Sequence, residues 1–303
     1  MFGNRHLIKI LLISSLLSGA SAAIAKDAAH PSASQIGVGA QYDTTHVYVA
    51  PEDVDKFAAS FLATFGGQST KQVVVTVTPT PSSTTSQLLQ TPVGTVSLFG
   101  FKTPIPYPFG AERTGYLVTD IDDAVKEAQA AGADVLVATF PDPIGRDVVI
   151  QWPGGVNMQL YWHTTKPSYA PYETIPENRV YVSPERADVL IRGFLRFSHG
   201  KVVSDDTHAS GAEIGRPKDT YRRIRIESVF GKMAVFVTDG QLPYPYGREL
   251  TGYEVKDLQG TLTKARASGA AVLVEPYTSD GRAATMVQFP GGYIAEIHAA
   301  ASK

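Results

Sequence analysis

The sequence predicts an α+β protein made of two copies of one unit, each a half-closed, mostly antiparallel sheet with its helices outside. A duplicated motif is the strongest observation, because residues 107–116 return as residues 244–253 with seven of the ten positions identical. A weaker repeat of one strand, one helix and three strands occurs twice within each copy. The connections from strand to helix are too short for a Rossmann unit and contain no glycine-rich phosphate loop.

Composition excludes several classes of function. The chain has 303 residues, 43% hydrophobic and 18% charged, so it is long enough for two domains with separate cores. A formal net charge of −2 leaves no basic surplus to neutralise phosphates, which argues against nucleic acid as a partner. The absence of cysteine excludes disulfides, thiolate nucleophiles and cysteine metal sites.

The first 25 residues have the pattern of a secretory signal peptide. A basic start is followed by an apolar run at 10–17, too short to span a bilayer, and then by small residues. The alternative interpretation is an N-terminal membrane anchor. Cleavage after Ala22 or Ala25 would release a periplasmic or secreted protein with no stable membrane span. Residues 26–43, rich in alanine, serine and glycine, are then expected to form a flexible leader.

The first domain is expected over residues 44–164. It opens with a strand at 45–49, rich in β-branched and aromatic residues. The helix that follows begins near Pro51, and its apolar residues Val54, Phe57 and Phe61 share one face. Further elements are predicted as strands at 72–77, 93–101, 115–118, 135–138, 147–152 and 156–162, a turn-rich segment at 78–86 and a helix at 121–131.

A linker at 165–177, which contains three prolines, leads to a second domain expected over residues 178–299. Strand, helix and motif recur there in the order of the first copy, so the same fold is expected. An insertion is predicted between Ser204 and Asp219. The last strand, at 293–298, follows a Pro-Gly-Gly turn as the last strand of the first copy does.

This order of residues resembles the vicinal oxygen chelate superfamily, which includes glyoxalase I, bleomycin-resistance proteins and extradiol dioxygenases. The family pattern runs from a strand with His and an Asp-headed helix, through a strand and a V-x-D helix start, to a turn and a strand ending in Glu-Leu or Glu-Ile. The first copy holds these places with His46, Asp53, Arg113, Val118-Thr119-Asp120 and Gln159-Leu160, and the second with Arg179, Leu250, Val255-Lys256-Asp257 and Glu296-Ile297. The resemblance implies two glyoxalase-like domains, each of two βαβββ modules forming a half-closed sheet around a cleft.

In active members of that superfamily, His, Glu or Gln side chains hold a divalent metal that chelates vicinal oxygens of the substrate. Arginine has no lone pair for a metal, and leucine has no ligand atom. The resemblance therefore leaves three inherited groups that could contact a metal, His46, Gln159 and Glu296. They lie in different copies, so one site would need a shared cleft. The expected cofactor is Fe, Mn, Zn or Ni, or no metal at all.

Other candidates follow from the same comparison of copies. Glu112 and Glu249 recur in the motif, either as general bases in two pockets or as loop carboxylates that cap backbone N–H groups. Arg113 and Arg179 are suited to an anionic ligand. The expected remaining ligand-binding residues are Tyr48, Tyr161, Tyr181 and Trp162 on apolar walls, and His298, which shares a strand face with Glu296.

Two functions remain open at this point. One is an exported glyoxalase- or dioxygenase-like enzyme, a lyase, isomerase or dioxygenase acting on a small oxygenated or aromatic molecule. The other is a metal-free protein that binds or sequesters a small molecule, as bleomycin-resistance proteins do; a purely structural periplasmic module is a weaker third hypothesis. The sequence leaves open whether the domains pair within one chain or across a homodimer.

Overall fold

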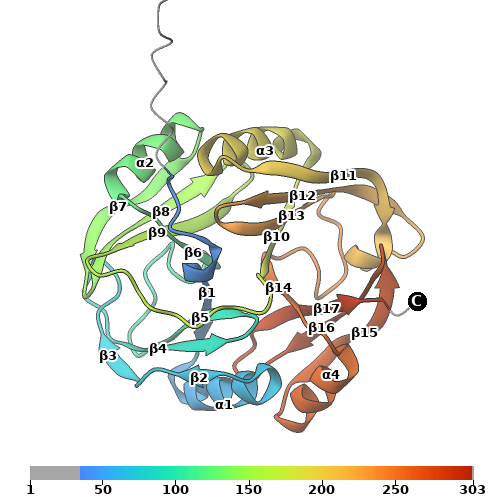
Figure 1. Ribbon diagram of the computed structural model, residues 1–303, viewed down its shortest axis with the longest axis horizontal. Coiled ribbons are helices and arrows are strands. Elements are labelled where there is room, and N and C mark those ends of the chain that lie inside the picture. Colours follow the sequence, from blue (N-terminus) through green and yellow to red (C-terminus); the bar gives the residue numbers. More distant parts are fainter. Residues whose placement is uncertain (1–34, 302–303) are drawn as a thin grey trace, which may run out of the picture. The chain divides into compact units, whose positions relative to one another are not determined.

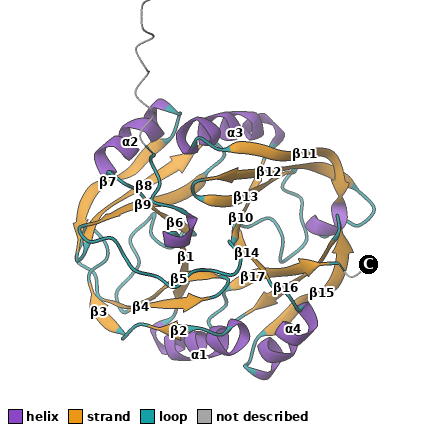
Figure 2. Ribbon diagram, in the orientation of Figure 1, coloured by secondary structure: helices purple, strands orange, loops and turns teal. Residues whose placement is uncertain are grey.

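The computed structural model describes residues 35–301 (Figure 1). The predicted signal peptide and the first part of the predicted leader lie outside the described residues. None of the helices within 35–301 has the length and the apolar character needed to cross a membrane. Two curled sheets, of nine and eight strands, make up most of the described chain, and four α-helices lie outside them (Figure 2).

Two βαβββ modules share the first sheet. Their first strands, β1 (Thr44–Val49) and β6 (Thr114–Leu117), pair antiparallel at its centre. Each first strand also pairs in parallel with the last strand of its own module. The other elements are α1 (Val54–Phe65), β2 (Gln68–Ser69), β3 (Val73–Val75), β4 (Thr84–Thr91), β5 (Gly94–Phe101), α2 (Ile121–Ala130), β7 (Asp134–Asp142), β8 (Gly145–Trp152) and β9 (Val156–His163), with short 3-10 turns at Ala40–Tyr42 and Pro51–Asp53.

The second sheet repeats this topology. Strands β10 (Glu177–Val182) and β14 (Leu250–Glu254) pair antiparallel at the centre, and each pairs in parallel with the last strand of its module. The other elements are α3 (Pro184–Ser198), β11 (Lys201–Ser210), a 3-10 turn (Gly211–Ile214), β12 (Thr220–Ser228), β13 (Gly231–Val237), α4 (Leu258–Ala267), β15 (Ala271–Ser279), β16 (Arg282–Gln288) and β17 (Ile294–Ala300). The predicted fold class, a tandem repeat of βαβββ pairs, is confirmed.

The two sheets pack against each other through two apolar cores that cross the duplication. One core joins the second module of the first sheet to the first module of the second sheet, around Trp152, Phe194 and Phe230. The other joins the first and last modules, around Phe57 and Phe289. Helix α2 accordingly lies beside α3, and α1 beside α4 (Figures 1 and 2). Side chains alternate along each strand, so the opposite face of each sheet is left to line a cleft.

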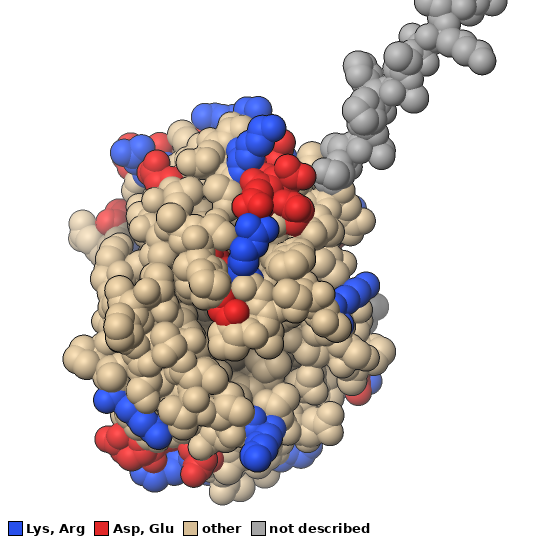
Figure 3. Space-filling model, turned by 90° about the vertical axis from the view of Figure 1, so that its left-hand side faces the viewer, with Lys and Arg blue, Asp and Glu red and all other residues tan. Residues whose placement is uncertain are grey.

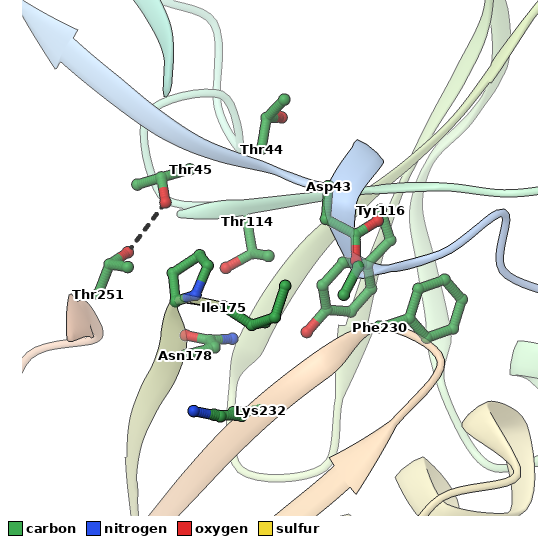
Figure 4. A pocket seen from close by; sticks show the side chains of 12 residues that line it. Asp43, Thr44, Thr45, Thr114, Tyr116, Ile175, Asn178, Phe230, Lys232 and Thr251 are labelled. Atoms are coloured by element: carbon green, nitrogen blue, oxygen red, sulfur yellow. Dashed lines mark hydrogen bonds between the residues drawn. The ribbon is translucent and has the colours of Figure 1, made fainter. Parts of the chain in front are cut away.

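A polar seam lies between the two cores, around a cavity of about 30 Å³ (Figure 4). The hydroxyl oxygens of Thr45 and Thr251, one from each sheet, lie 3.3 Å apart. Burial raises the pKa of Asp43 well above its usual range, and the carboxyl accepts a hydrogen bond from the Leu117 N–H. The cavity has about the volume of one water molecule.

Three local predictions need correction. The segment at 78–86 is not all turn, because β4 begins at Thr84 and pairs with β5 along its whole length. The flexible leader does not extend over residues 35–43: Ile36 is buried in a core and the Val38 N–H donates to the Leu117 carbonyl. The predicted insertion at 204–219 is a longer β11 and a 3-10 turn rather than a free loop.

The duplicated motif forms the same turn twice, ahead of β6 and β14. Gly110 and Gly247 have φ angles of 87° and 89°, a region that side chains with a Cβ rarely adopt. The peptide bonds before Pro108 and Pro245 are cis in both copies. The turn therefore explains why these residues are identical in both halves, whatever each half binds.

Candidate functional site

The first sheet curls around an open cleft of about 220 Å³. Strand β1 directs His46 and Tyr48 into it, while Val47 and Val49 on the other face enter an apolar core. The opposite wall comes from β9, with Gln159, Tyr161 and His163. The structure thus brings together His46, Gln159, Tyr48 and Tyr161, four of the residues predicted for sites.

A carboxylate lies behind the imidazole in this cleft. Glu112 is wholly buried, accepts a hydrogen bond from the Tyr48 hydroxyl, and has its Oε1 3.5 Å from His46 Nδ1. Burial, and then the negative charge of Glu112, raise the pKa of Tyr48 well above its usual range. The carboxylate therefore anchors the Tyr48 hydroxyl and lies beside the imidazole, whose other nitrogen, Nε2, is on the side of Gly115.

The polar wall also contains the carboxyl group of Asp147. Burial raises the pKa of Asp147 well above its usual range, and the neighbouring Asp142 adds to the shift, while the Gln159 amide beside it opposes it. A carboxyl group that stays protonated can donate a hydrogen bond. Tyr161 donates its hydroxyl to the Tyr42 carbonyl, which fixes its ring at the end of the cleft.

The wall that faces Gln159 and Asp147 is apolar beyond His46 and Tyr48. It includes Val75 and Leu88, and Phe99 lies with its ring centroid 5.2 Å from that of Tyr48. At the outer edge, Val73 and Ile144 are 46% and 55% exposed. The surface on the side of β3 and β7 carries few charged side chains in its middle, and most of them gather towards its ends (Figure 3). One polar wall and one apolar wall suit a small molecule with a flat apolar body and a few oxygens.

Charged side chains fill the interior of the second sheet instead. Arg179 Nη1 lies 2.9 Å from Glu177 Oε1 and 3.4 Å from Glu296 Oε1, and its guanidinium group covers the Phe236 ring at 4.5 Å. Glu296 Oε2 lies 2.8 Å from His298 Nδ1. All five side chains are buried. Arg179 is therefore held by the protein's own carboxylates, not free for a ligand.

More arginines extend this network. Arg223 donates to Glu213 at 2.7 Å and to Asp280 at 2.8 Å, and Arg225 also pairs with Asp280. Burial alone would raise the pKa of Glu177, but Arg179, Arg282, His298 and Arg225 together lower it to about 2. The carboxylates here stay charged because guanidinium groups surround them. Tyr181, predicted to line a pocket, lies among these groups and stacks on Phe236.

Both copies have glycine where their central strands face the cleft. A methyl group at Gly115 would lie 2.5 Å from His46 Nε2, and one at Gly252 would lie 2.6 Å from Glu296 Oε2. The residues aligned with the family position lie two positions earlier in the chain: Arg113 directly precedes β6, and Leu250 is the first residue of β14. Because Gly115 and Gly252 occupy the positions nearest to His46 and Glu296, no side chain reaches these two residues from there.

The donor atoms do not fit the metal that the resemblance implies. His46 and Gln159 share one cleft, but Glu296 lies in the other sheet, ion-paired with Arg179. The shared cleft that one site of these three residues would need is not formed. Within residues 35–301, no three His, Asp or Glu side chains converge as a metal site requires. In the second sheet, Arg179 places a fixed positive charge between two carboxylates, where the resemblance has the first ligand.

The predicted pair of bases also separates. Glu112 touches His46 and Tyr48, whereas Glu249 lines a different pocket, at the junction of the two copies, together with Arg113. The two glutamates therefore do not lie in equivalent pockets, as the general-base alternative would require. Trp162 lies on the outer face of β9, under the Arg146 guanidinium group, and does not line the first cleft.

The sequence comparison missed several residues of the first cleft. Asp147, Ser97 and Phe99 line it from β8 and β5. Their alternation with Val148 and Val96, which enter the cores, is the signal that could have placed them once the face of each strand was known.

The chain resembles known proteins in its fold rather than in its sequence. No protein-family model matches the sequence, and no curated protein matches it. A triple mutant of 4-hydroxymandelate synthase from Streptomyces coelicolor matches with a TM-score of 0.57 and 13% identity, over 88% of this chain and 94% of that one. Its fold is that of the vicinal oxygen chelate superfamily. The resemblance found in the sequence is thereby confirmed at the level of fold.

Two further vicinal oxygen chelate structures match over most of their length. The 2,3-dioxygenase LapB from Pseudomonas sp. KL28 has a TM-score of 0.51 and 12% identity, over 87% of this chain and 93% of that chain. The Mn(II)-bound glyoxalase from Novosphingobium aromaticivorans has a TM-score of 0.50 and 14% identity, over 87% and 82%. These likenesses establish the fold alone, because the same fold hosts different functions.

Proposed function

We propose that the first cleft binds a small, flat, oxygen-bearing aromatic molecule and that it does so without a metal. The observation that supports this most directly is the cleft itself: about 220 Å³, with Val75, Leu88 and Phe99 on the same side as His46, and Gln159 and Asp147 on the opposite wall. The apolar wall favours an aromatic ring, and the polar wall supplies donors and acceptors for its oxygens. The names of the similar enzymes, a synthase of a hydroxylated aromatic acid and a 2,3-dioxygenase, agree with such a ligand class.

Catechol is a suitable probe because it is flat, neutral and carries two vicinal oxygens. Isothermal titration should detect its binding to the purified chain treated with a chelator. Ser97 lies on β5 beside His46 and makes no side-chain hydrogen bond within the described residues. Leucine at this position would fill the cleft, so Ser97→Leu should weaken catechol binding by about tenfold or more.

The matched control is Ser69→Leu, the same substitution on the exposed strand β2, outside the cleft. It should bind catechol as the parent chain does. Equal binding by both variants would show that catechol does not occupy the first cleft. A ligand carried through purification and identified by mass spectrometry would name the natural molecule.

Metal analysis separates this proposal from the metalloenzyme hypothesis. We expect less than stoichiometric Fe, Mn, Zn and Ni in the purified chain, because only His46 and Gln159 of the inherited donors share the cleft. Stoichiometric metal that is lost in His46→Ala would contradict the metal-free proposal. It would favour a lyase, isomerase or dioxygenase of the metal-dependent kind.

A second candidate function, proton transfer, is supported by the contact between His46 and Glu112. A buried carboxylate 3.5 Å from Nδ1 is placed to orient the imidazole. His46 would be the catalytic residue and Glu112 a positioning residue. Exchange of the α-protons of 2-hydroxyacetophenone in D₂O, followed by NMR, should be faster with the parent chain than with His46→Gln. Equal rates would remove this candidate.

Residues 1–25 motivate a proposal about location. Their basic start, short apolar run and small residues are typical of a secretory signal. We expect the mature protein in the periplasm or outside the cell. Fractionation of cells that express the full chain, with sequencing of the mature N-terminus, tests this.

A further inference from the structure

A second pocket, of about 360 Å³, lies where the two copies meet. Both copies of the motif contribute to it, through residues 111 and 113 from the first and 248–251 from the second. Tyr48 lies between this junction pocket and the first cleft, since it lines both. Apart from Tyr48, the two spaces share no lining residue. The ligand of the junction pocket is therefore proposed separately from the ligand of the first cleft.

Two arginines line the junction pocket at positions where the duplication is broken. Arg113 occupies the place that Leu250 has in the second copy, and Arg248 the place that Ala111 has in the first. All four residues line the pocket. The fold thus accepts leucine or alanine at these places, so the arginines are not needed to form the turn.

Neither arginine is neutralised. Within residues 35–301, no carboxylate oxygen lies within ion-pair distance of Arg113 or Arg248, whereas Arg179 and Arg223 each contact at least two carboxylates. The Arg248 guanidinium group lies 5.3 Å from the centre of the Tyr244 ring. The charge of Arg113 acts on Tyr48, Glu249 and Tyr293, all of which line the pocket.

The carboxyl group of Glu249 does not cancel this charge at neutral pH. Burial raises the pKa of Glu249 to about 8, against the opposing effects of Asn178 and Arg113. Its Oε1 is buried and has no hydrogen-bond partner within the described residues. A protonated carboxyl can donate a hydrogen bond to an anion, whereas an ionised one would repel it.

We propose that the junction pocket binds a small organic carboxylate. The planar guanidinium group of Arg113 matches a carboxylate with two parallel hydrogen bonds, and Arg248 adds a second positive charge at the rim. Leu250 and Ile294 line the same pocket and provide apolar contact for the carbon part of the ligand. This apolar contact favours an organic anion over inorganic phosphate.

Succinate is the probe, because it is anionic and not aromatic. Titration at constant ionic strength should show succinate binding to the purified full-length chain. Arg113→Leu, which introduces the residue of the second copy, should weaken it by about tenfold or more, the loss expected for a charge-assisted pair. Arg248→Ala, the residue of the first copy, should weaken it less.

Two controls make the result specific. Arg192→Leu removes the same charge from an exposed position on α3, and should leave succinate binding unchanged. Ser97→Leu, which fills the first cleft, should also leave it unchanged, so failure of this inference is distinguishable from failure of the proposed function. Absence of succinate binding, an equal loss in Arg113→Leu and Arg192→Leu, or tighter binding of inorganic phosphate would each overturn the proposal.

Discussion

Glu112 and Glu249 hold the same place in the two copies of the motif, yet their carboxyl groups have different surroundings. Glu112 accepts from Tyr48 and faces His46, while Glu249 is half-buried, with its Oε1 buried, near Asn178 and Arg113. The difference arises because Glu112 faces the first strand of its own sheet, whereas Glu249 lies at the junction of the two copies, near Arg113 of the first. One backbone position thus serves two electrostatic roles.

The carboxyl group of Glu249 should make the stability of the protein depend on pH. Its pKa is raised from 4.5 to about 8 in the folded protein, so the folded state binds the proton more tightly than the unfolded state. Stability from this group is complete below pH 4.5 and is lost as pH rises through 8, by at most about 1.4 kcal/mol per pH unit. The parent chain should therefore lose stability relative to Glu249→Gln between these values.

Urea unfolding of both proteins at a series of pH values measures the difference. The two free energies of unfolding should diverge above pH 4.5 and run parallel again above about pH 8. A constant difference over the whole range would mean that Glu249 ionises normally in the folded protein.

At the scale of elements, the first strand of each sheet decides what its cleft contains. Strand β1 directs His46 and Tyr48 inwards, and the space in front of them stays open. Strand β10 directs Glu177, Arg179 and Tyr181 inwards, and buried ion pairs occupy that space. The guanidinium group of Arg179 is a permanent cation that needs no ion from solution.

Removal of this cation should be costly. Arg179→Met would remove the guanidinium group that pairs with both buried carboxylates, Glu177 and Glu296, and a loss of about 3–5 kcal/mol in the free energy of unfolding is expected. Arg266→Met is the matched control, because the Arg266–Glu275 pair on the surface should contribute less than about 1 kcal/mol. Denaturant unfolding of both variants tests this. A similar small loss in the two would show that the network is not held by Arg179.

At the scale of the whole molecule, the duplication was readable from the sequence because the turn needs the same residues twice. Gly110 and Gly247 must adopt positive φ, so the motif persisted while the cleft residues changed. The resemblance predicted the order of the strands that carry His46 and Gln159, and this order places both residues in one cleft. The fold, and part of the first site, could therefore be predicted.

The other features of the two sites could not be predicted, because they depend on contacts between segments that are distant in the sequence. Arg179 is neutralised by Glu177 and Glu296. These carboxylates come together only when β10 and β17 both lie near the centre of one sheet. That Glu249 differs from Glu112 follows from the packing of one sheet on the other, which no local pattern encodes. Strand β4 was partly missed because threonine and serine at 84–86 are also typical of turns.

The central claim is that the two copies have diverged, one keeping an open ligand cleft and the other filling its interior with ion pairs. A crystal of the chain soaked with catechol tests this most directly. Density for the ring in the first cleft, between Phe99 and Gln159, with Arg179 still paired to Glu296, is the predicted result. Density for the ring inside the second sheet, or for a metal ion bound to His46, would contradict it.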